Sequence, residues 1–441
     1  MARSERIAAA LIAAAVVPVW IVRFFPTQDG PSHLYNAFVL ARIGNAPLLQ
    51  QFFVINVAPF PNWTTYLLMA PLTLVLPPLV VQQIVISLCV IGIAVSTLYL
   101  QKSFKGAVDA TGLLGGMLAY SYLLFLGFFN FVLGAALFAV TVGFWWRHKD
   151  SRGRLASTGL YGLLALTYFT HALPFAAAVF AIALLAILEK RWRTLLILIP
   201  AFLIVAMDAF TRISAQREYR SFVWHLQNII DLRPLVYFGD PHVWIARVTF
   251  VALVVAIAFT RRRNAMAWVT LALLIGYFIA PWGYGAGGWT LGGWVSDRLL
   301  FLALMTLPAW VECRRPAVAI AVVLVVTHFA LTTVDLVRMS LRIAGVARAA
   351  SLIRPHSTIQ SLGGKAETLH VASYLALRED VVNLDDYEAH LRDFPVVFRR
   401  NAPRPAPDYL LVWRDAHVRN VAGYHIVYAA ADVRLFARAG L

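Results

Sequence analysis

Long apolar runs alternate with short polar segments along most of the chain. A helix of roughly 18 or more apolar residues is long enough to cross the hydrocarbon core of a bilayer. The pattern therefore predicts about eleven membrane helices. They are expected at 7–25, 79–100, 110–126, 128–146, 156–171, 173–188, 194–210, 246–260, 265–281, 299–311 and 317–334.

The composition supports an all-α polytopic membrane protein. Of the 441 residues, 60% are hydrophobic and only 14% are charged, whereas about a quarter of the residues of a soluble domain are charged. No internal sequence repeat is evident, which counts against a transporter built from inverted repeats.

Basic residues gather at every second end of the apolar runs. Lys102 and Lys105 follow one run, and Arg3 and Arg6 precede the first. Because cytoplasmic loops carry an excess of Lys and Arg, the N-terminus is expected in the cytoplasm and the C-terminus outside. The stretch 62–77 is short and ends at a Pro-Pro pair, so we expect it to lie on or partly in the outer surface. If this stretch were instead a full span, every later segment would lie on the opposite side of the membrane.

The net charge of +16 is accounted for by these basic helix ends. It does not require nucleic acid as a partner, and we expect none. Anionic lipid head groups are the expected partners of the basic ends. The prediction is an integral protein of a bacterial inner (cell) membrane, with a role in the cell envelope.

The outer side is expected to collect several polar segments, namely 26–78, 211–245, 282–298 and everything after 334. Charges become frequent in that last part, and short alternating runs predict strands. We therefore expect a membrane domain over 1–334 and a small extracytoplasmic α/β domain over 335–441. Its strands are expected at 408–413, 424–429 and 433–438, and its helices near 365–378 and 385–392.

One polar stretch, "FPTQDGPSHLYNAF" (25–38), stands directly after the first apolar run. Pro31 suits the first turn of a helix, with Asp29 or Gly30 as its cap. Apolar positions then recur on one face, so 31–43 is expected to lie on the membrane as an amphipathic helix. Asp29 would sit at the positive end of the helix dipole, with His33 one turn further on.

Two interpretations of this pair stay open. Asp29 is only a helix cap and His33 only a polar residue at the interface, or Asp29 is a carboxylate that takes a proton from a nucleophile or holds a cation. In the second case His33 is its partner, a phosphate contact or a second ligand. Two residues do not make a metal site, so a divalent cation is possible and no cofactor is assigned.

A family resemblance adds to this. The segment "DGPSHLYNAFVLARIG" follows the first helix, and "PNWTTYLLMAPLTLVLPP" and a long second span follow it. With the outer C-terminal domain, this layout resembles the integral-membrane glycosyltransferases of the GT-C superfamily. The resemblance implies that a sugar moves from a polyprenyl-phosphate carrier to a glycan or lipid acceptor on the outer face, with Asp29 as the general base.

The chain departs from that family's pattern at one position. Members typically carry a second acid next to the first, and here the next residue is Gly30. The second acidic role is therefore empty or filled from elsewhere, and a non-catalytic relative of the family remains an alternative.

Cations at the outer boundary are candidates for the donor phosphate, because arginine matches phosphate geometry with two parallel hydrogen bonds. The sequence "TRISAQREYRSFVWHLQ" and the start of a later span supply them. The candidates are Arg212, Arg217, Arg220, His225 and Arg298. A solvated loop helix for the first four, and an interfacial anchor paired with Asp297 for Arg298, are the alternatives.

Other outer residues are weaker candidates. His171 stands at the tip of a helical hairpin, where an ionisable group is a site hypothesis. Asp208 lies near an outward helix end and is the alternative candidate for the general base or for the missing second acid. Tyr284 and Trp289 belong to a Gly- and Trp-rich segment, whose aromatics either stack on a sugar or sit among head groups.

Three functions follow in order of preference. The first is a membrane glycosyltransferase of GT-C type. The second is a transporter or flippase of a lipid-linked saccharide, which would need buried ionisable groups along a path through the bilayer; the spans offer few. The third is a non-catalytic GT-C-like protein.

Overall fold

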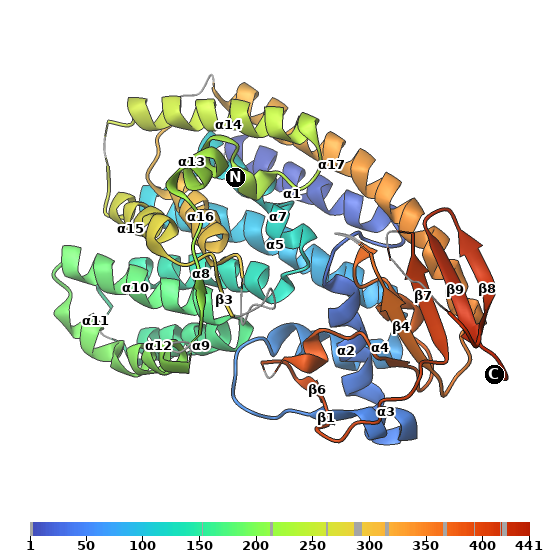
Figure 1. Ribbon diagram of the computed structural model, residues 1–441. Helices are drawn as coiled ribbons and strands as arrows, with labels where there is room; N and C mark the ends of the chain where they lie inside the picture. The colour runs from blue at the N-terminus through green and yellow to red at the C-terminus, as the bar shows by residue number, and fades with distance from the viewer. Residues whose placement is uncertain are drawn as a thin grey trace. The chain divides into compact units, whose positions relative to one another are not determined.

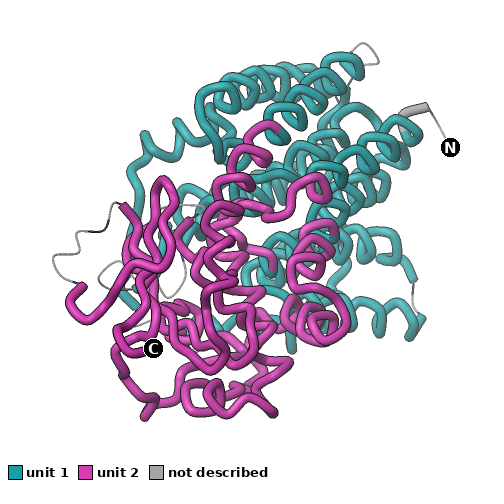
Figure 2. Tube along the Cα trace, turned by 90° about the vertical axis from the view of Figure 1, so that its right-hand side faces the viewer, with its two compact units in different colours: residues 1–18, 88–124, 130–333 teal, residues 19–87, 125–129, 334–441 magenta. Residues whose placement is uncertain are grey.

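The computed structural model is mostly helical, with a small sheet near the C-terminus (Figure 1). It describes residues 3–151, 153–211, 215–261, 263–285, 293–313, 317–364, 368–391, 393–414, 416 and 421–441. The chain forms two compact units, each built from segments far apart in sequence (Figure 2). Unit 1 comprises 1–18, 88–124 and 130–333, and unit 2 comprises 19–87, 125–129 and 334–441.

Unit 1 is helical, and several of its helices begin or end in unit 2. The helices that lie in it wholly or in part are α1 (Arg3–Ile21), α5 (Pro78–Lys105), α6 (Leu114–Ala119), α7 (Tyr122–Phe125), α8 (Phe129–His148), α9 (Arg154–Thr170), α10 (Ala172–Leu188), α11 (Trp192–Ile197), α12 (Ile199–Thr211), α13 (Phe222–Ile230), α14 (Asp240–Phe259), α15 (Met266–Ile279), α16 (Val295–Thr306) and α17 (Ala317–Ala347). A short antiparallel pair, β2 (Arg217–Glu218) and β3 (Gly283–Tyr284), links two of its loops.

Four helices among the described residues are long and apolar enough to cross a membrane, at Pro78–Lys105, Phe129–His148, Asp240–Phe259 and Ala317–Leu352. Further apolar helices of 10–17 residues accompany them. These helices agree with an integral membrane protein, while the count of about eleven spans stays a prediction.

Several predicted helices are interrupted, and proline accounts for two of the breaks. The apolar run 194–210 divides into α11 and α12 just before Pro200, which has no N–H to continue the helical ladder. The run 299–311 becomes α16 followed by a 3₁₀ turn that contains Pro308. By contrast α17 continues to Ala347, well past its predicted end at 334, and neither proline nor glycine occurs between 335 and 344.

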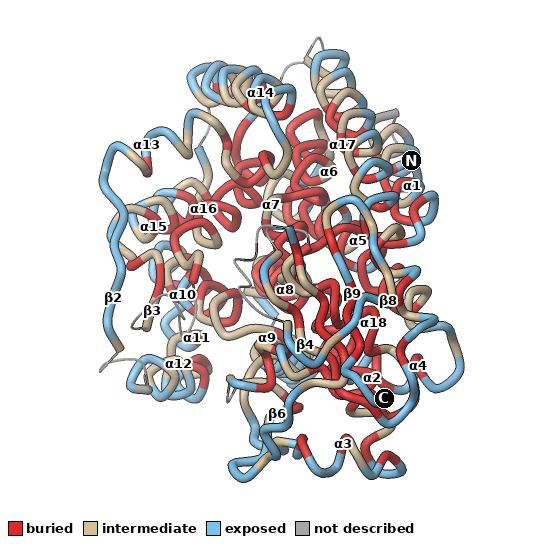
Figure 3. The backbone as a smooth tube through the Cα atoms, turned by 45° about the vertical axis from the view of Figure 1, so that its right-hand side comes forward, coloured by how far each residue is buried: buried red, intermediate tan, exposed pale blue. Residues whose placement is uncertain are grey.

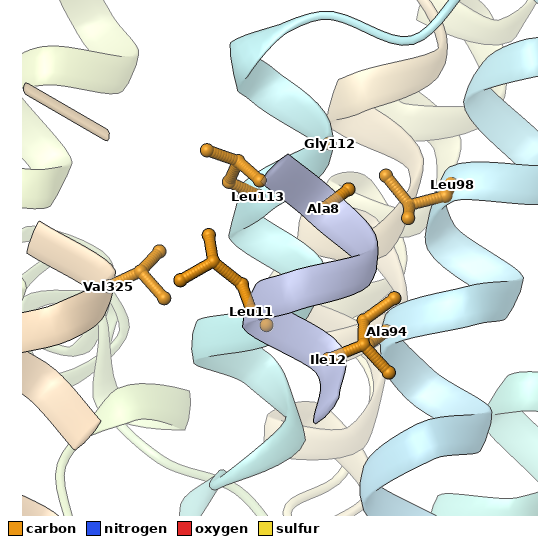
Figure 4. A pocket seen from close by; sticks show the side chains of 9 residues that line it. Ala8, Leu11, Ile12, Ala94, Leu98, Gly112, Leu113 and Val325 are labelled. Carbon is orange, nitrogen blue, oxygen red and sulfur yellow. The ribbon is translucent and has the colours of Figure 1, made fainter. Parts of the chain in front are cut away.

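Two cavities in the described part of unit 1 differ greatly in size. Figure 4 shows a small apolar one lined by α1, α5 and their neighbours, with Leu11, Leu98 and Val325 on its wall. Its volume of about 10 Å³ is no larger than one water needs, so it has no room for a ligand. An apolar crevice of about 1220 Å³ is lined by residues of α14 and α17, with Arg247 and Glu312 among the few charged groups.

Unit 2 combines the first polar segment with the C-terminal part of the chain. Its helices are α2 (Gly30–Arg42), α3 (Pro47–Phe52), α4 (Thr64–Val75) and α18 (Ala372–Leu375). Its strands are β1 (Phe53–Ile55), β4 (Thr358–Leu362), β5 (Val382–Asn383), β6 (Val396–Phe398), β7 (Tyr409–Trp413), β8 (Tyr424–Ala430) and β9 (Val433–Arg438).

The sheet of unit 2 has five strands in the order β5-β4-β7-β9-β8. The pairs β4–β5 and β4–β7 are parallel, and β7–β9 and β8–β9 are antiparallel. The three strands predicted from alternation are confirmed as β7, β8 and β9. The helix predicted at 385–392 is wrong, since only the 3₁₀ turn η7 (Glu388–His390) forms there, and of 365–378 the described residues form only α18.

One hydrophobic core joins the two parts of unit 2. Strand β1 pairs with β6, with Phe53 opposite Phe398, and residues of α2 pack with residues of the C-terminal sheet. Helix α2 is buried from Gly30 to Val39 (Figure 3). The expected amphipathic helix lying on the membrane is therefore wrong, because α4, α18 and β6 cover the faces that would have been polar or exposed.

Candidate active site

The loop before α2 is fixed by the backbone of residues 125–127. The N–H of Gln28 donates to the Phe125 carbonyl at 2.9 Å, and the N–H of Asp29 donates to the Leu126 carbonyl at 3.1 Å. Gly127 has φ +87° and lies so close that a Cβ there would come within 2.9 Å of the Asp29 nitrogen. Only glycine fits this approach, and it sets where the Asp29 carboxylate lies.

Asp29 stands at the N-cap position of α2, but its side chain makes no capping hydrogen bond. The side chain is 9% exposed and lies within hydrogen-bonding reach of Gln28 and Tyr387. Burial raises the pKa of Asp29 to about 6, although the positive charge of His33 opposes that rise. Asp29 therefore does not cap α2 with its side chain, and its role as a base stays a prediction.

His33 is buried, and two partners contact its Nδ1. Its Nδ1 lies 2.6 Å from the Tyr66 hydroxyl and 2.8 Å from Oε1 of Glu388. The rings of Phe129 and Phe394 pack around it, with centroids 5.6 and 6.3 Å away. Burial would lower the pKa of His33, but the attraction of Glu388 and the hydrogen bond to it raise that pKa above its ordinary value.

Two acids from the C-terminal segment face α2. Glu388 accepts from Asn36 Nδ2 at 3.2 Å and from the Tyr66 hydroxyl. Asp386 accepts from Ser32 Oγ at 2.9 Å and from Asn36 Nδ2 at 3.1 Å. Burial, reinforced by repulsion from Glu388, raises the pKa of Asp386 to about 8, so this acid is mostly protonated at neutral pH.

His370 approaches Asp29 from the same C-terminal segment. Its Nε2 lies 3.6 Å from Oδ1 of Asp29, and its ring stacks on Tyr387 with centroids 4.5 Å apart. Burial, with repulsion from His33, lowers the pKa of His370 to about 3. His370 is therefore neutral at physiological pH, and at 3.6 Å it lies beside Asp29 without adding a positive charge.

Gly30 has no space for a side chain. A Cβ at this position would collide with Oγ1 of Thr27 and would lie 2.9 Å from both Gln82 Nε2 and Phe129 Cζ. An acid directly after Asp29 is therefore excluded by packing. The acids that lie near Asp29 and His33 instead come from residues 386–388.

The comparisons with known proteins bear on the fold. No family model matches the chain, and no curated protein matches it significantly in sequence. The solved structures that match along almost the whole length include ArnT from Cupriavidus metallidurans bound to undecaprenyl phosphate, and the same protein in the apo state. Both have a TM-score of 0.62 over 99% of this chain and 98% of theirs, with 12% and 11% sequence identity.

The chain has the fold of ArnT. ArnT is a GT-C glycosyltransferase, so the GT-C layout inferred from the sequence is confirmed at the level of the fold. An identity near 12% does not carry residue roles from one protein to the other, and the roles argued below rest on the geometry of this chain.

His171 and Arg298, two of the predicted site residues of unit 1, lie next to each other. Nη1 of Arg298 is 3.3 Å from Nε2 of His171, and its guanidinium lies over the Phe131 ring at 5.4 Å. Asp297 accepts from Trp282 Nε1 at 3.0 Å, and its pairing with Arg298 stays a prediction.

The other predicted phosphate contacts of unit 1 have mixed surroundings. Arg220 pairs with Glu218 at 3.0 Å and lies over the Trp282 ring at 4.2 Å. Arg217 is exposed and pairs through its backbone with Tyr284 in the β2–β3 ladder. These two arginines remain candidates for a phosphate.

Two of the remaining predicted residues are described and two are not. His225 is 2% exposed and packs edge-on against Tyr277, and burial lowers its pKa. Asp208 is half-buried on α12 in unit 1, whereas the Asp29 cluster lies in unit 2. Arg212 and Trp289 lie outside the described residues.

The described residues contain no group of three or more His, Cys, Asp or Glu side chains arranged to hold a metal ion. The sequence pointed to Asp29 and His33, whose roles stay predictions, and it gave no indication that Glu388, Asp386, Tyr387 and His370 lie beside them. The acids of "NLDDYEAH" (383–390) carry a local signal, yet that segment was assigned to a soluble helix. Its burial against α2 could not be seen from spacing, because more than 340 residues separate the two in sequence.

Proposed function

We propose that the protein is a membrane glycosyltransferase that moves a sugar from a polyprenyl-phosphate carrier to a hydroxyl of a glycan or lipid acceptor on the extracytoplasmic face. The likeness of the fold to ArnT over 99% of the chain carries this proposal. One of the two ArnT structures is bound to undecaprenyl phosphate, which supports a donor of that chemical class.

Asp29 is the proposed general base. It takes the proton of the acceptor hydroxyl as that oxygen attacks the anomeric carbon of the sugar. The bond from the anomeric carbon to the phosphate oxygen breaks, and the polyprenyl phosphate leaves with the electron pair. A single displacement of this kind inverts the anomeric configuration. The pKa of Asp29, about 6, suits a base that must be ionised near neutral pH and still hold a proton.

The donor phosphate requires a cation, and the proposal keeps Arg298, Arg217 and Arg220 for that role. Arg298 lies beside His171, so the two can face one phosphate together. The apolar crevice lined by α14 and α17 is large enough for an isoprenoid chain and is the proposed site for the tail of the donor.

The experiment measures transfer from a panel of polyprenyl-phosphate sugars by the full chain in lipid nanodiscs, with an acceptor extract. Wild type, Asp29→Asn and Asp208→Asn are compared, and donor binding and thermal unfolding are measured for each. Loss of a general base costs roughly 10²–10⁴-fold in rate. We expect a loss of that size in Asp29→Asn, with donor binding and folding kept, and near wild-type transfer in Asp208→Asn.

The pH profile gives a second readout. Since only the ionised form of Asp29 accepts a proton, the wild-type rate should rise through pH 6 and level off above it. At pH 5, one unit below the pKa, about a tenth of the carboxylate is ionised and the rate should be about a tenth of the plateau. Equal transfer by Asp29→Asn would move the base elsewhere, with Asp208 first. Donor binding without transfer by wild type would favour a flippase or a non-catalytic relative.

A further inference from the structure

Glu388 reaches His33 from η7, in the C-terminal segment of unit 2. Its side chain is fully buried, and its Oε1 lies 2.8 Å from Nδ1 of His33. Its Oε2 accepts from Asn36 and from the Tyr66 hydroxyl. A buried carboxylate is tolerated only when a partner charge and hydrogen bonds replace water. The partner charge that this geometry offers is the protonated ring of His33.

The surroundings favour the imidazolium form of His33. Burial by itself would lower the pKa of His33, but the charge of Glu388 and the hydrogen bond to it reverse that effect, and Asp29 and the Gly127 carbonyl add to the reversal. The other titratable groups that face this pair or Asp29 are Tyr66, Asp386, Tyr387 and His370.

The charge of His33 acts in turn on Asp29. Burial drives the pKa of Asp29 upward, and among the opposing effects the attraction of His33 is the largest. Without the imidazolium, Asp29 would be protonated over more of the neutral range and would be a weaker base. Direct repulsion from Glu388 also acts on Asp29, but it is smaller than the attraction of His33.

We propose that Glu388 does the work of the second acid of this site by keeping His33 protonated, so that His33 in turn keeps Asp29 ionised. Glu388 is a positioning residue, since it touches His33 and not the reacting atoms. The catalytic meaning of this inference rests on the proposed function, whereas the charge state of His33 does not.

The test is a ¹⁵N NMR titration of histidine-labelled full chain in nanodiscs, which needs neither donor nor acceptor. The chain has 11 histidines, and the His33 signal is the one missing from His33→Gln. In wild type, His33 should titrate above the ordinary value of a histidine. In Glu388→Gln its midpoint should fall, because the largest of the effects that oppose burial is then removed and only Asp29 and the Gly127 carbonyl still act against it. Glu388→Asp should restore part of the shift, and the exposed Glu379→Gln should leave it unchanged.

Each outcome decides something. A His33 that is neutral at pH 7 in wild type overturns the inference even if Glu388→Gln does not fold, and so does an unchanged midpoint in a folded Glu388→Gln. Where transfer is measured, the acid limb of the Glu388→Gln rate profile should move to higher pH, since loss of the His33 charge outweighs loss of Glu388 repulsion. A charged His33 in a protein that transfers no sugar would refute the proposed function and leave this inference standing.

Discussion

The substitution Gly30→Ala tests the packing that shapes the Asp29 site. The added methyl group would overlap Thr27 and would lie 2.9 Å from Gln82 Nε2 and from the ring of Phe129. The Phe129 ring is 0% exposed, so it has no solvent to move into. Gly44 is the matched control, because a Cβ there meets nothing within 4 Å and it belongs to the same unit.

The size of the effect follows from opposing contributions. Over-packing a core by one methyl group costs about 1–3 kcal/mol of stability. Because the added methyl group would meet several atoms at once, we expect the cost for Gly30→Ala to be about 3 kcal/mol. Alanine in a helix recovers roughly 0.5–1 kcal/mol relative to glycine. The net loss should be about 2 kcal/mol for Gly30→Ala, whereas Gly44→Ala should be neutral or stabilising by a few tenths.

The assay is thermal unfolding in nanodiscs, followed by tryptophan fluorescence at one fixed scan rate. Gly30→Ala should unfold at a clearly lower temperature than wild type and Gly44→Ala. Gly30→Asp should be worse still, since it adds a buried carboxylate to the same collision. If Gly30→Ala and Gly44→Ala unfold at the same temperature, the packing around Asp29 is not as described and the steric argument for a distant second acid fails.

Two further predictions concern acids of the C-terminal segment. Because the folded pKa of Asp386 is raised to about 8, the stability linked to Asp386 is full below the unfolded pKa and is lost as pH rises through 8. Wild type should therefore lose on the order of 2 kcal/mol more than Asp386→Asn between pH 6 and 9, measured as unfolding temperature against pH; parallel curves would contradict this. Asp380 accepts hydrogen bonds from the N–H groups of Leu48 and Leu49 at 3.0 and 2.8 Å, where α3 begins. Asp380→Asn should therefore cost about 1–3 kcal/mol of stability and unfold at a lower temperature than the exposed control Glu379→Gln. Equal unfolding temperatures of the two variants would show that this cap contributes nothing.

The sequence was informative wherever one local rule decided the structure. Apolar runs of about 18 residues gave α5 and α8 nearly to their ends, because bilayer thickness and helical rise fix that length. Alternation of period two gave β7, β8 and β9. The breaks near Pro200 and Pro308 were missed, since hydropathy does not register a missing N–H.

Only those residues of the candidate site that lie close together in the sequence could be predicted. Asp29 and His33 could be found because a helix start and a one-turn spacing are written in neighbouring residues. The burial of α2 was mispredicted, and the reason lies elsewhere in the chain. Tyr35, expected on an interfacial helix, instead bonds the Val381 carbonyl and the Asn383 N–H. A contact over 346 residues leaves no trace in periodicity.

The same contacts decide how the C-terminal segment relates to the site. Ser32, His33 and Asn36 lie in the first two turns of α2, and each of them hydrogen-bonds or pairs with Asp386 or Glu388. Without these two acids, three buried polar side chains of α2 would lose hydrogen-bond partners that water could not replace. If Asp29 is the base proposed above, the C-terminal segment therefore belongs to the same site. Packing forbids an acid next to Asp29, and Asp386 and Glu388 bring acids to α2 from the other end of the chain.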